Sequence, residues 1–292
     1  MVEPMTARKL KTRLPARTLV AESWQERVRG LLVAILALAM ALFLAVPFVA
    51  LIWRALTLEG QMPAAELSIF SAVMLSLGST AVTVVLIVLL GTPLAYFVAR
   101  YQFPFKRLLT IIIEIPIVMP PVVAGLALLS AFGRRGLIGR TLAGFDITIT
   151  FTLAAVILAQ LFVSSPFYIR AAQSRFESLP SEYEDAAAVD GANRWVIFWR
   201  VMFPQSRQAL LAGLILSWAR ALGEFGATIL FAGNLQGRTQ TMPLLVYGAL
   251  ERDLRVTFIT ALILLGLAVL AFTVTRWLAG VEDDEADTPT YL

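Results

Sequence analysis

The chain has 292 residues, of which 59% are hydrophobic and only 15% are charged. Soluble chains carry roughly 25% charged residues, and a mean hydropathy of +0.79 indicates more apolar surface than a core of this size can bury. These values exclude an ordinary soluble domain and predict an integral membrane protein covered in part by lipid. The net charge of +4 comes from dispersed basic residues, which is not the signature of a nucleic-acid partner.

Cysteine and histidine are both absent from the sequence. Without cysteine, the chain has no disulfide, no thiolate metal site and no thiol nucleophile. Without histidine, it lacks the commonest metal ligand and the usual general base near neutral pH. The two absences exclude serine–histidine hydrolases, histidine-ligated zinc proteases and haem-binding bundles, and we expect no cofactor in this chain.

Six apolar segments are long enough to cross a bilayer, which takes about 20 residues for roughly 30 Å of hydrocarbon. In chain order they are 31–53, a segment within 67–99, 108–132, 147–169, 208–232 and 256–278. The first is longer than the apolar core of a signal peptide, about 7–15 residues, so we expect it to be retained. The sequence therefore predicts an all-α polytopic membrane protein with six transmembrane helices.

The third segment carries a charge and three prolines. Prolines 116, 120 and 121 are expected to break its helix and free backbone carbonyls, which a cavity-lining position could satisfy. Glu114 lies only about 10 Å of helix rise beyond Arg107. That spacing favours an interfacial position for Glu114 over a place in a transport pathway.

Basic residues in the connecting segments predict the orientation. With a cytoplasmic N-terminus, 16 basic residues lie in inner segments and seven in outer ones, although Arg134, Arg135 and Arg140 lie on the outer side against the trend. Both termini are therefore expected in the cytoplasm. We divide the chain into a cytoplasmic extension (1–30), a transmembrane domain (31–279) and an acidic tail (280–292) without an assigned function.

A long inner segment, about 170–205, separates the fourth and fifth spans. Ser181 and Glu184 have the spacing of a capping box at the start of a short helix, and the acidic first turn suits the helix dipole. Gly191 can take the left-handed conformation that ends such a helix, and Asn193 is a suitable cap for a second one. The segment is expected to form two short helices.

This two-helix segment has two interpretations. Alanines 186 to 188 offer a small surface that a partner's backbone can approach closely. Aromatic residues at helical spacing would seat the second helix at the membrane surface: Trp195, Phe198, Trp199 and Phe203. In the first interpretation, the segment docks into a cleft on a cytosolic partner. In the second, it is an ordinary helix–turn–helix loop that lies on the membrane. The residues alone fit both equally well.

The segment resembles the EAA loop of permeases of binding-protein-dependent ABC importers. The family pattern is E-A-A, three residues, G, nine residues and I-x-L-P. Here Asp185-Ala186-Ala187 precedes Gly191 by three residues, and nine more lead to Val201-Met202-Phe203-Pro204. Asp for Glu and Phe for Leu are chemically mild departures at fixed spacing. The resemblance extends over most of the chain after the first span, but excludes the first 30 residues and the tail.

Other stretches resemble the oxyanion branch of this family. Residues 219–234, ARALGEFGATILFAGN, look like a signature of molybdate, tungstate and sulfate permeases. The stretches PIVMPP (116–121), GRRG (133–136) and TQTMP (239–243) are similar too. The molybdate/tungstate branch fits best, and a sulfate or thiosulfate permease is the alternative.

The resemblance implies partners as well as a function. Two permease subunits, here expected as a homodimer, would enclose the pathway, and an extracytoplasmic binding protein would deliver the oxyanion. The chain lacks a G-x-x-x-x-G-K-[ST] loop, so ATP and magnesium are expected on a separate cytosolic ATPase dimer, and the chain itself is no enzyme. The resemblance assigns ATPase coupling to Glu184, Asp185, Ala186, Ala187, Gly191 and Pro204.

Two opposite charges lie within the fifth predicted span. Charges in a membrane are costly and usually face a cavity or a partner. Arg220 and Glu224 are four residues apart, so they either neutralise one another on one helical face or border a pathway in which Arg220 attracts the anion. Gly223 and Gly226 allow close packing or a hinge, and packing is the simpler interpretation.

Two other classes of protein remain as alternatives. An ion-gradient-driven secondary transporter can have broken helices, but it has no need for an ATPase-docking loop. An aspartyl intramembrane enzyme needs aspartates within its spans, and none of the six predicted spans contains one.

Overall fold

The computed structural model describes residues 24–58 and 65–286, and every regular element within these ranges is helical. Three helices are long and apolar enough to cross a membrane, in segments Val28–Thr57, Ser68–Arg100 and Leu153–Ser178. The all-α prediction for a polytopic membrane protein is confirmed. Most of the predicted extension, residues 1–23, lies outside the described residues.

The chain divides into two compact units at residue 51. Helix α1 (Trp24–Thr57) supplies the described residues of the first unit and contains the first predicted span. Its apolar segment has a hydropathy of 2.8, the highest of the three candidate spans. This length of apolar helix is enough to span a bilayer, and its retention stays a prediction.

The second unit is built around helices α2 (Ala65–Arg100), α6 (Leu153–Ser178) and α9 (Phe203–Leu222), which pack against one another. Small residues allow the close approach that drives helix association in lipid. A Cβ atom on Gly213 would lie 2.6 Å from the Ala171 Cβ, and one on Gly91 would lie 3.1 Å from the Tyr168 ring. The glycines thus determine the spacing of the three helices.

Polar side chains add hydrogen bonds between these helices. The Thr83 hydroxyl of α2 donates to the Gln160 Oε1 of α6 at 3.0 Å, and Gln160 Nε2 donates to the Ser79 hydroxyl at 3.1 Å. From α9, Trp218 Nε1 donates to the Thr80 hydroxyl at 3.1 Å. Buried hydroxyls and amides find partners on neighbouring helices because the apolar surroundings offer none.

The third and fifth predicted spans are broken helices. The third consists of α3 (Lys106–Val118) and α4 (Pro121–Phe132), so the break expected from its prolines forms beside Pro120 and Pro121, whereas Pro116 lies within α3. The fifth consists of α9 and a short α10 (Gly226–Phe231), and the break between them at residues 223–225 was not expected. A single continuous helix over 208–232 is therefore wrong, because the backbone leaves the helix after Leu222.

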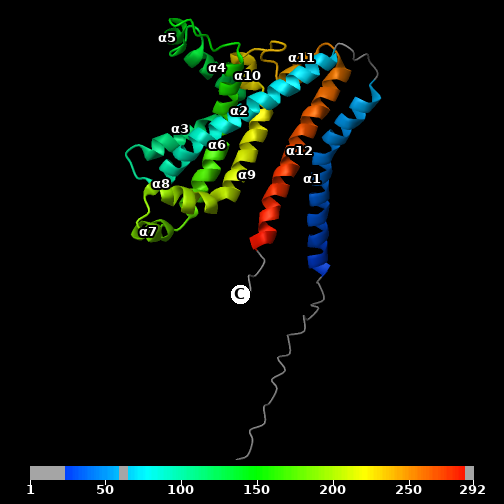
Figure 1. The fold of residues 1–292 in the computed structure, drawn as a ribbon. Coiled ribbons are helices and arrows are strands. Elements are labelled where there is room, and N and C mark those ends of the chain that lie inside the picture. The colour runs from blue at the N-terminus through cyan, green and yellow to red at the C-terminus, as the bar shows by residue number, and fades with distance from the viewer. Residues whose placement is uncertain (1–23, 59–64, 287–292) are drawn as a thin grey trace, which may run out of the picture. The chain divides into compact units, whose positions relative to one another are not determined.

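The remaining helices complete the second unit. They are α5 (Gly139–Ala143), α7 (Glu182–Val189), α8 (Arg194–Ile197), the π-helical turn η1 (Phe198–Met202), α11 (Met242–Leu250) and α12 (Leu254–Ala286). Helix α12 contains the sixth span and continues through residues 280–286. In Figure 1, α7 and α8 lie at one end of this unit, and α5 and α10 lie at the other.

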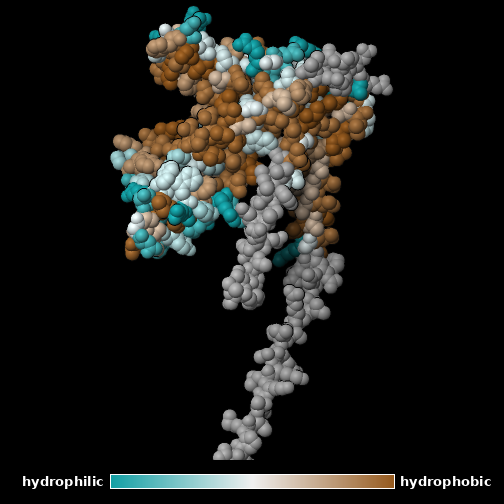
Figure 2. All heavy atoms as spheres, in the orientation of Figure 1, coloured by the Kyte–Doolittle hydropathy of each residue, from teal (hydrophilic) through white to brown (hydrophobic). Residues whose placement is uncertain are grey.

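Hydrophilic and hydrophobic residues are distributed along the second unit according to the positions of its two ends. Figure 2 shows hydrophilic residues gathered around the ends that carry α7 and α5, with a hydrophobic band between them. Such a band is what a bilayer requires of the side chains that it contacts. The two polar ends therefore correspond to the two sides of a membrane.

Candidate functional site

Helix α7 begins without the capping box that the sequence predicted. Ser181 has helical backbone angles (φ −65°, ψ −23°), and its side chain accepts no capping hydrogen bond. A capping serine needs an extended backbone. The Glu184 carboxylate instead forms an ion pair with Arg100 of α2, 2.8 Å between Oε1 and Nε. The acidic first turn is present, but Glu184 stabilises a tertiary contact rather than its own helix end.

The end of α7 follows the sequence closely. Gly191 has a φ of +81°, the left-handed conformation that favours glycine. Its N–H donates to the Ala188 carbonyl at 3.0 Å, and the Ala192 N–H donates to the Ala187 carbonyl at 3.0 Å. This pair of hydrogen bonds is a Schellman motif. The role predicted for Gly191 in ending the helix is confirmed.

The second short helix is also capped as predicted, since the Asn193 Oδ1 accepts from the Val196 N–H at 2.9 Å. The π-helical turn η1 that follows was not predicted. Pro204, in the first turn of α9, has no N–H for the Arg200 carbonyl, and its ring crowds that carbonyl. A wider π turn just before a proline relieves both problems.

The coupling residues implied by the resemblance fall on two faces of α7. Asp185 and Ala186 are exposed, together with Val189, whose side chain is 88% exposed. Glu184 and Ala187 face the protein, where Ala187 packs against the cluster around Phe176. The surface available to a partner is thus the face that carries Asp185, Ala186 and Val189, and sequence reasoning missed Val189.

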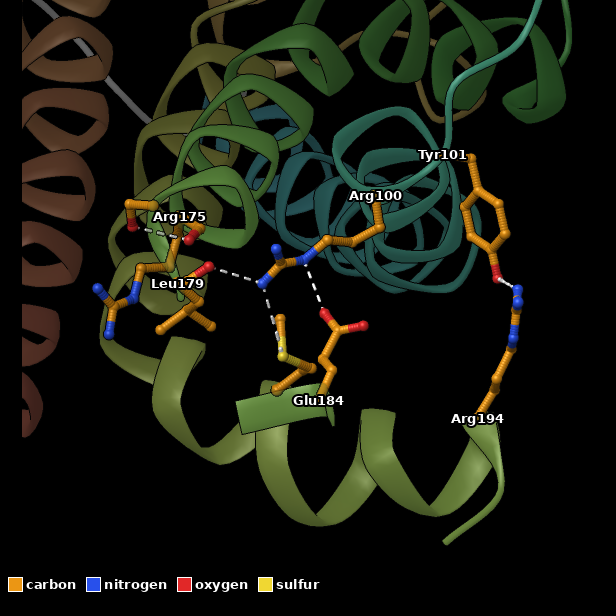
Figure 3. Close-up of polar contacts among 8 residues, drawn as sticks. Arg100, Tyr101, Arg175, Leu179, Glu184 and Arg194 are labelled. Carbon is orange, nitrogen blue, oxygen red and sulfur yellow. Dashed lines mark hydrogen bonds and ion pairs between the residues drawn. The ribbon is translucent and has the colours of Figure 1, made fainter. Parts of the chain in front are cut away.

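Residues at the C-terminal ends of α2 and α6 contact the loop on the side that faces the protein (Figure 3). Besides its ion pair, Arg100 donates from Nη2 to the Leu179 carbonyl at 2.9 Å. Arg194 of α8 donates to the Tyr101 hydroxyl at 2.6 Å. Arg175 of α6 donates to the Gln205 carbonyl at 2.7 Å and 3.1 Å. Arg100 and Arg194 therefore position the two short helices, and Arg175 holds the start of α9. None of the three was among the predicted coupling residues.

Of the aromatic residues in the loop, some pack inside the protein and others are exposed. Phe198 packs edge-on against Tyr96, with ring centroids 5.1 Å apart, and lies near Phe176. Trp195 and Trp199 contact each other but are exposed by 70% and 45%. Seating of these two tryptophans at the membrane surface, where indole side chains are enriched, stays a prediction.

The predicted pair of charges in the fifth span forms, with a different geometry. Arg220 Nη1 lies 2.7 Å from Glu224 Oε2. Because α9 ends at Leu222, Glu224 lies in the break rather than on the helical face of Arg220. Its Oε1 accepts from the Ala227 N–H at 2.7 Å, and its side chain is only 1% exposed. Glu224 thus supports the start of α10, while Arg220 remains 29% exposed.

The two glycines of this region behave differently. Gly226 touches α4, where an added Cβ would lie 2.5 Å from the Pro121 Cβ. Nearby, a Cβ on Gly125 would lie 2.9 Å from the Ala227 backbone. Gly223 is exposed and has no such crowding. The packing interpretation therefore holds for Gly226, whose contact brings the breaks of the third and fifth spans together.

Glu114 forms an ion pair with Arg170 of α6, 2.9 Å between Oε1 and Nη1. The Arg170 and Glu114 side chains are 50% and 40% exposed, and Arg170 lies in the half of α6 that leads to α7. The interfacial location of Glu114 stays a prediction.

At the other end of the second unit, an open hollow of about 470 Å³ is lined by Arg134, Arg135 and neighbouring residues. Within residues 24–58 and 65–286, no group of acidic side chains is placed to hold a metal ion.

Comparison with known proteins agrees with this geometry. The family model of "binding-protein-dependent transport system inner membrane component" matches residues 91–280. The molybdenum transport system permease protein ModB of Mycobacterium tuberculosis is 39% identical over 247 residues, covering 79% of this chain and 90% of the relative. The sulfate transport system permease protein CysW of Synechococcus elongatus is 41% identical over 195 residues, 67% of this chain and 68% of the relative.

Two solved structures are similar in fold. A chain of a bacterial ABC transporter for import of the acidic polysaccharide alginate has a TM-score of 0.66 at 15% identity, covering 87% of this chain and 98% of that one. A chain of the MetNI methionine ABC transporter has a TM-score of 0.60 at 17% identity, covering 76% of this chain and 99% of that one. At this identity the likeness concerns the fold alone.

Proposed function

The chain belongs to the family of inner membrane components of binding-protein-dependent transport systems, and from this premise we propose that it carries a tetrahedral oxyanion, molybdate or tungstate first, across the cytoplasmic membrane. It is the permease subunit of an ABC importer, not an enzyme, and ATP hydrolysis belongs to a separate subunit. The observation that carries the choice of cargo is the 39% identity to a molybdenum permease over 90% of that relative's length.

Sulfate is the second candidate for the cargo. The sulfate relative is 41% identical, over a smaller share of both chains. Molybdate, tungstate and sulfate are all tetrahedral dianions, so one permease geometry suits all of them. Discrimination is expected to rest on the extracytoplasmic binding protein that delivers the ion.

The two ends of the second unit support a proposal about the partners. We propose that the exposed face of α7 docks into a cleft on a cytosolic ATPase dimer, and that a second copy of this chain completes the pathway. Both termini then lie in the cytoplasm. The opposite end, with α5 and α10, faces the binding protein. The exposed alanine and valine on α7 support this proposal, because a short apolar face suits close contact with a partner.

For the pathway itself, we propose that the crossing of α4 with α10 borders the route of the anion and that Arg220 supplies positive potential there. Discontinuous helices with irregular backbone occur at membrane depth where they are buried in protein or line a cavity. Glu224 is committed to the Ala227 N–H and to one nitrogen of Arg220. The rest of the partly exposed guanidinium is available to an anion.

Uptake in proteoliposomes tests the function. The chain, its ATPase and its binding protein are reconstituted, and uptake of labelled molybdate is measured with and without ATP, with sulfate and tungstate as competitors. We expect ATP-dependent uptake that tungstate inhibits at lower concentration than sulfate does, and no ATP hydrolysis by this chain alone. Stronger inhibition by sulfate would favour the sulfate assignment. Uptake that persists on an ion gradient without ATP would indicate a secondary transporter.

A further inference from the structure

The C-terminal end of α2 contacts every element of the coupling loop. Arg100 is the last residue of α2, and its guanidinium reaches three elements: the Glu184 carboxylate on α7, the Leu179 carbonyl at the end of α6, and the Met202 sulfur, 3.8 Å away in η1. The side chains of the ion pair are only 15% and 25% exposed. Little water competes for this pair, so it is stronger than one on an open surface.

Contacts of two tyrosines reinforce the same junction. Tyr101, directly after α2, accepts a hydrogen bond from Arg194, and the Arg194 guanidinium lies 5.3 Å from the centre of its ring. One turn earlier, Tyr96 packs edge-on against Phe198 of η1 and Phe176 of α6. These contacts hold α8 and η1. The ion pair of Arg100 with Glu184 is the polar contact that ties α7 itself to α2.

Nearer its middle, α2 is bound to α9, which leads into the break of the fifth span, and to α11. The Thr80 hydroxyl accepts from Trp218 of α9, half a turn before Arg220. The Ser76 hydroxyl accepts from the Met242 N–H at the start of α11, at 2.8 Å. About 30 Å of continuous helix separates Thr80 from Arg100. Helix α2, which contains Pro93, therefore has polar contacts to other helices near its middle and at its C-terminal end.

Besides the ion pair of Glu184 with Arg100, α7 has few contacts through which its movement could be transmitted to α2. It has eight residues, too short to be stable alone, and it lies between Pro180 and Gly191, where the backbone changes direction. Among its own side chains, Ala187 contacts the core cluster and Glu184 forms the ion pair with α2. If α7 moves, the movement would therefore reach α2 mainly through the ion pair of Glu184 with Arg100, because this pair resists being pulled apart.

We propose that Arg100 is the positioning residue that couples the docking helix to the membrane domain: its ion pair with Glu184 makes α2 follow α7. This inference rests on the proposed role of α7 in docking the ATPase. Loss of the pair leaves the outward face of α7 unchanged, so the ATPase still binds and hydrolyses ATP. Movement of α7 then reaches α2 less effectively, and fewer anions cross for each ATP hydrolysed.

The test uses the full transporter in proteoliposomes, with three readouts: ATPase subunit retained on the purified complex, ATP hydrolysis, and labelled molybdate uptake per ATP. The variants are Arg100→Gln, Glu184→Gln and the exchange Arg100→Glu with Glu184→Arg. Arg170→Gln is the matched control, since it breaks an ion pair with α3 at the same end of the molecule but away from α7. If Arg100→Gln does not reach the membrane, Glu184→Gln provides the same comparison.

We expect both single variants to retain the ATPase and lower uptake per ATP roughly tenfold, within the range of measured coupling free energies. The exchanged pair should regain much of that loss, and Arg170→Gln should match the unmodified protein. Unchanged uptake per ATP in both single variants would overturn the inference. So would loss of the bound ATPase, because Arg100 would then merely shape the docking surface. Failure of the docking proposal is seen separately, as normal ATPase retention when the outward residue Ala186 is replaced by arginine.

Discussion

The coupling loop and the crossing of α4 with α10 lie at opposite ends of the second unit and are held by different forces. In the loop, charged side chains reach backbone carbonyls and one another, and local turn motifs set the direction of the chain. At the crossing, backbones meet almost without side chains, at Gly226 against Pro121 and at Gly125 against Ala227. The loop is adjustable because its contacts are long side chains, whereas the crossing tolerates no added atom.

The difference matches what each region has to do under the proposed function. A loop that transmits motion needs contacts that stay intact while their geometry changes, and arginine side chains provide this. A helix crossing beside a pathway needs a fixed spacing, and rigid packing provides that. The predictions below test the comparison, beginning with the crossing, where the largest effects are expected.

Gly226→Val should strongly reduce the amount and the thermal stability of the folded, membrane-inserted protein. The new Cβ would lie 2.5 Å from the Pro121 Cβ and 3.1 Å from its carbonyl carbon, and the backbone of α4 cannot yield as a flexible side chain would. Overpacking costs about 1–3 kcal/mol and sometimes more, and here we expect the upper end. Fluorescence-detected size-exclusion after heating measures the effect. Gly78→Ala is the control, because nothing lies within 4 Å of its added Cβ.

Arg220→Gln should reduce both inserted protein and uptake. The buried Glu224 loses one partner but keeps the Ala227 N–H. The cost should therefore lie below the roughly 3–5 kcal/mol of breaking a fully buried pair. Adding Glu224→Gln should restore insertion but not uptake, when uptake is normalised to inserted protein. Recovery of both would show that Arg220 only neutralises Glu224 and would remove it from the pathway.

Substitutions on the two faces of α7 should have different consequences. Ala186→Arg and Val189→Asp, on the outward face, should release the ATPase while the permease stays folded. Ala187→Arg should instead destabilise the loop, because Ala187 packs against the cluster around Phe176. Co-purification of the ATPase and thermal stability of the permease separate the two. Normal ATPase retention in both outward-face variants would contradict the docking proposal.

Gly191→Val should have a smaller effect, about 1–2 kcal/mol on the loop, from the left-handed backbone alone. No atom lies within 4 Å of the added Cβ, so crowding does not contribute. Uptake should fall, and Gly191→Asn should behave almost normally because asparagine tolerates this conformation. Uptake by the two variants side by side is the measurement. Equal impairment by both would mean that the glycine serves contact with the partner rather than the turn.

The smallest effect is expected for Glu114→Gln. Both side chains of its ion pair with Arg170 are about half exposed, and pairs open to solvent contribute about 0–1 kcal/mol. Thermal stability and uptake should therefore stay close to those of the unmodified protein. A large loss of uptake with normal stability would place Glu114 in the pathway, against the interfacial assignment.

Much of this protein was predictable from local rules in the sequence. The length and polarity of the apolar segments determine that the chain crosses the membrane, because lipid admits only helices or closed barrels. Gly191, Asn193 and the prolines of the third span act on the backbone within a few residues of themselves. Their effects on helix ends and breaks were therefore correctly predicted, apart from Pro116, which lies within α3. The pairing of Arg220 with Glu224 was one of two alternatives, and it forms beyond the end of α9 rather than on one helical face.

Tertiary structure decided the features that depend on distant neighbours. Whether Glu184 caps its own helix or pairs with Arg100 depends on the end of α2, 84 positions earlier in the chain. The break after Leu222 is stabilised by contact of Gly226 with Pro121 and by the Ala227 N–H that holds Glu224. Which side of α7 is available to a partner depends on the core behind Ala187. Spacing in the sequence determines which groups lie near one another along a helix, but competition between helices determines which partner each group takes.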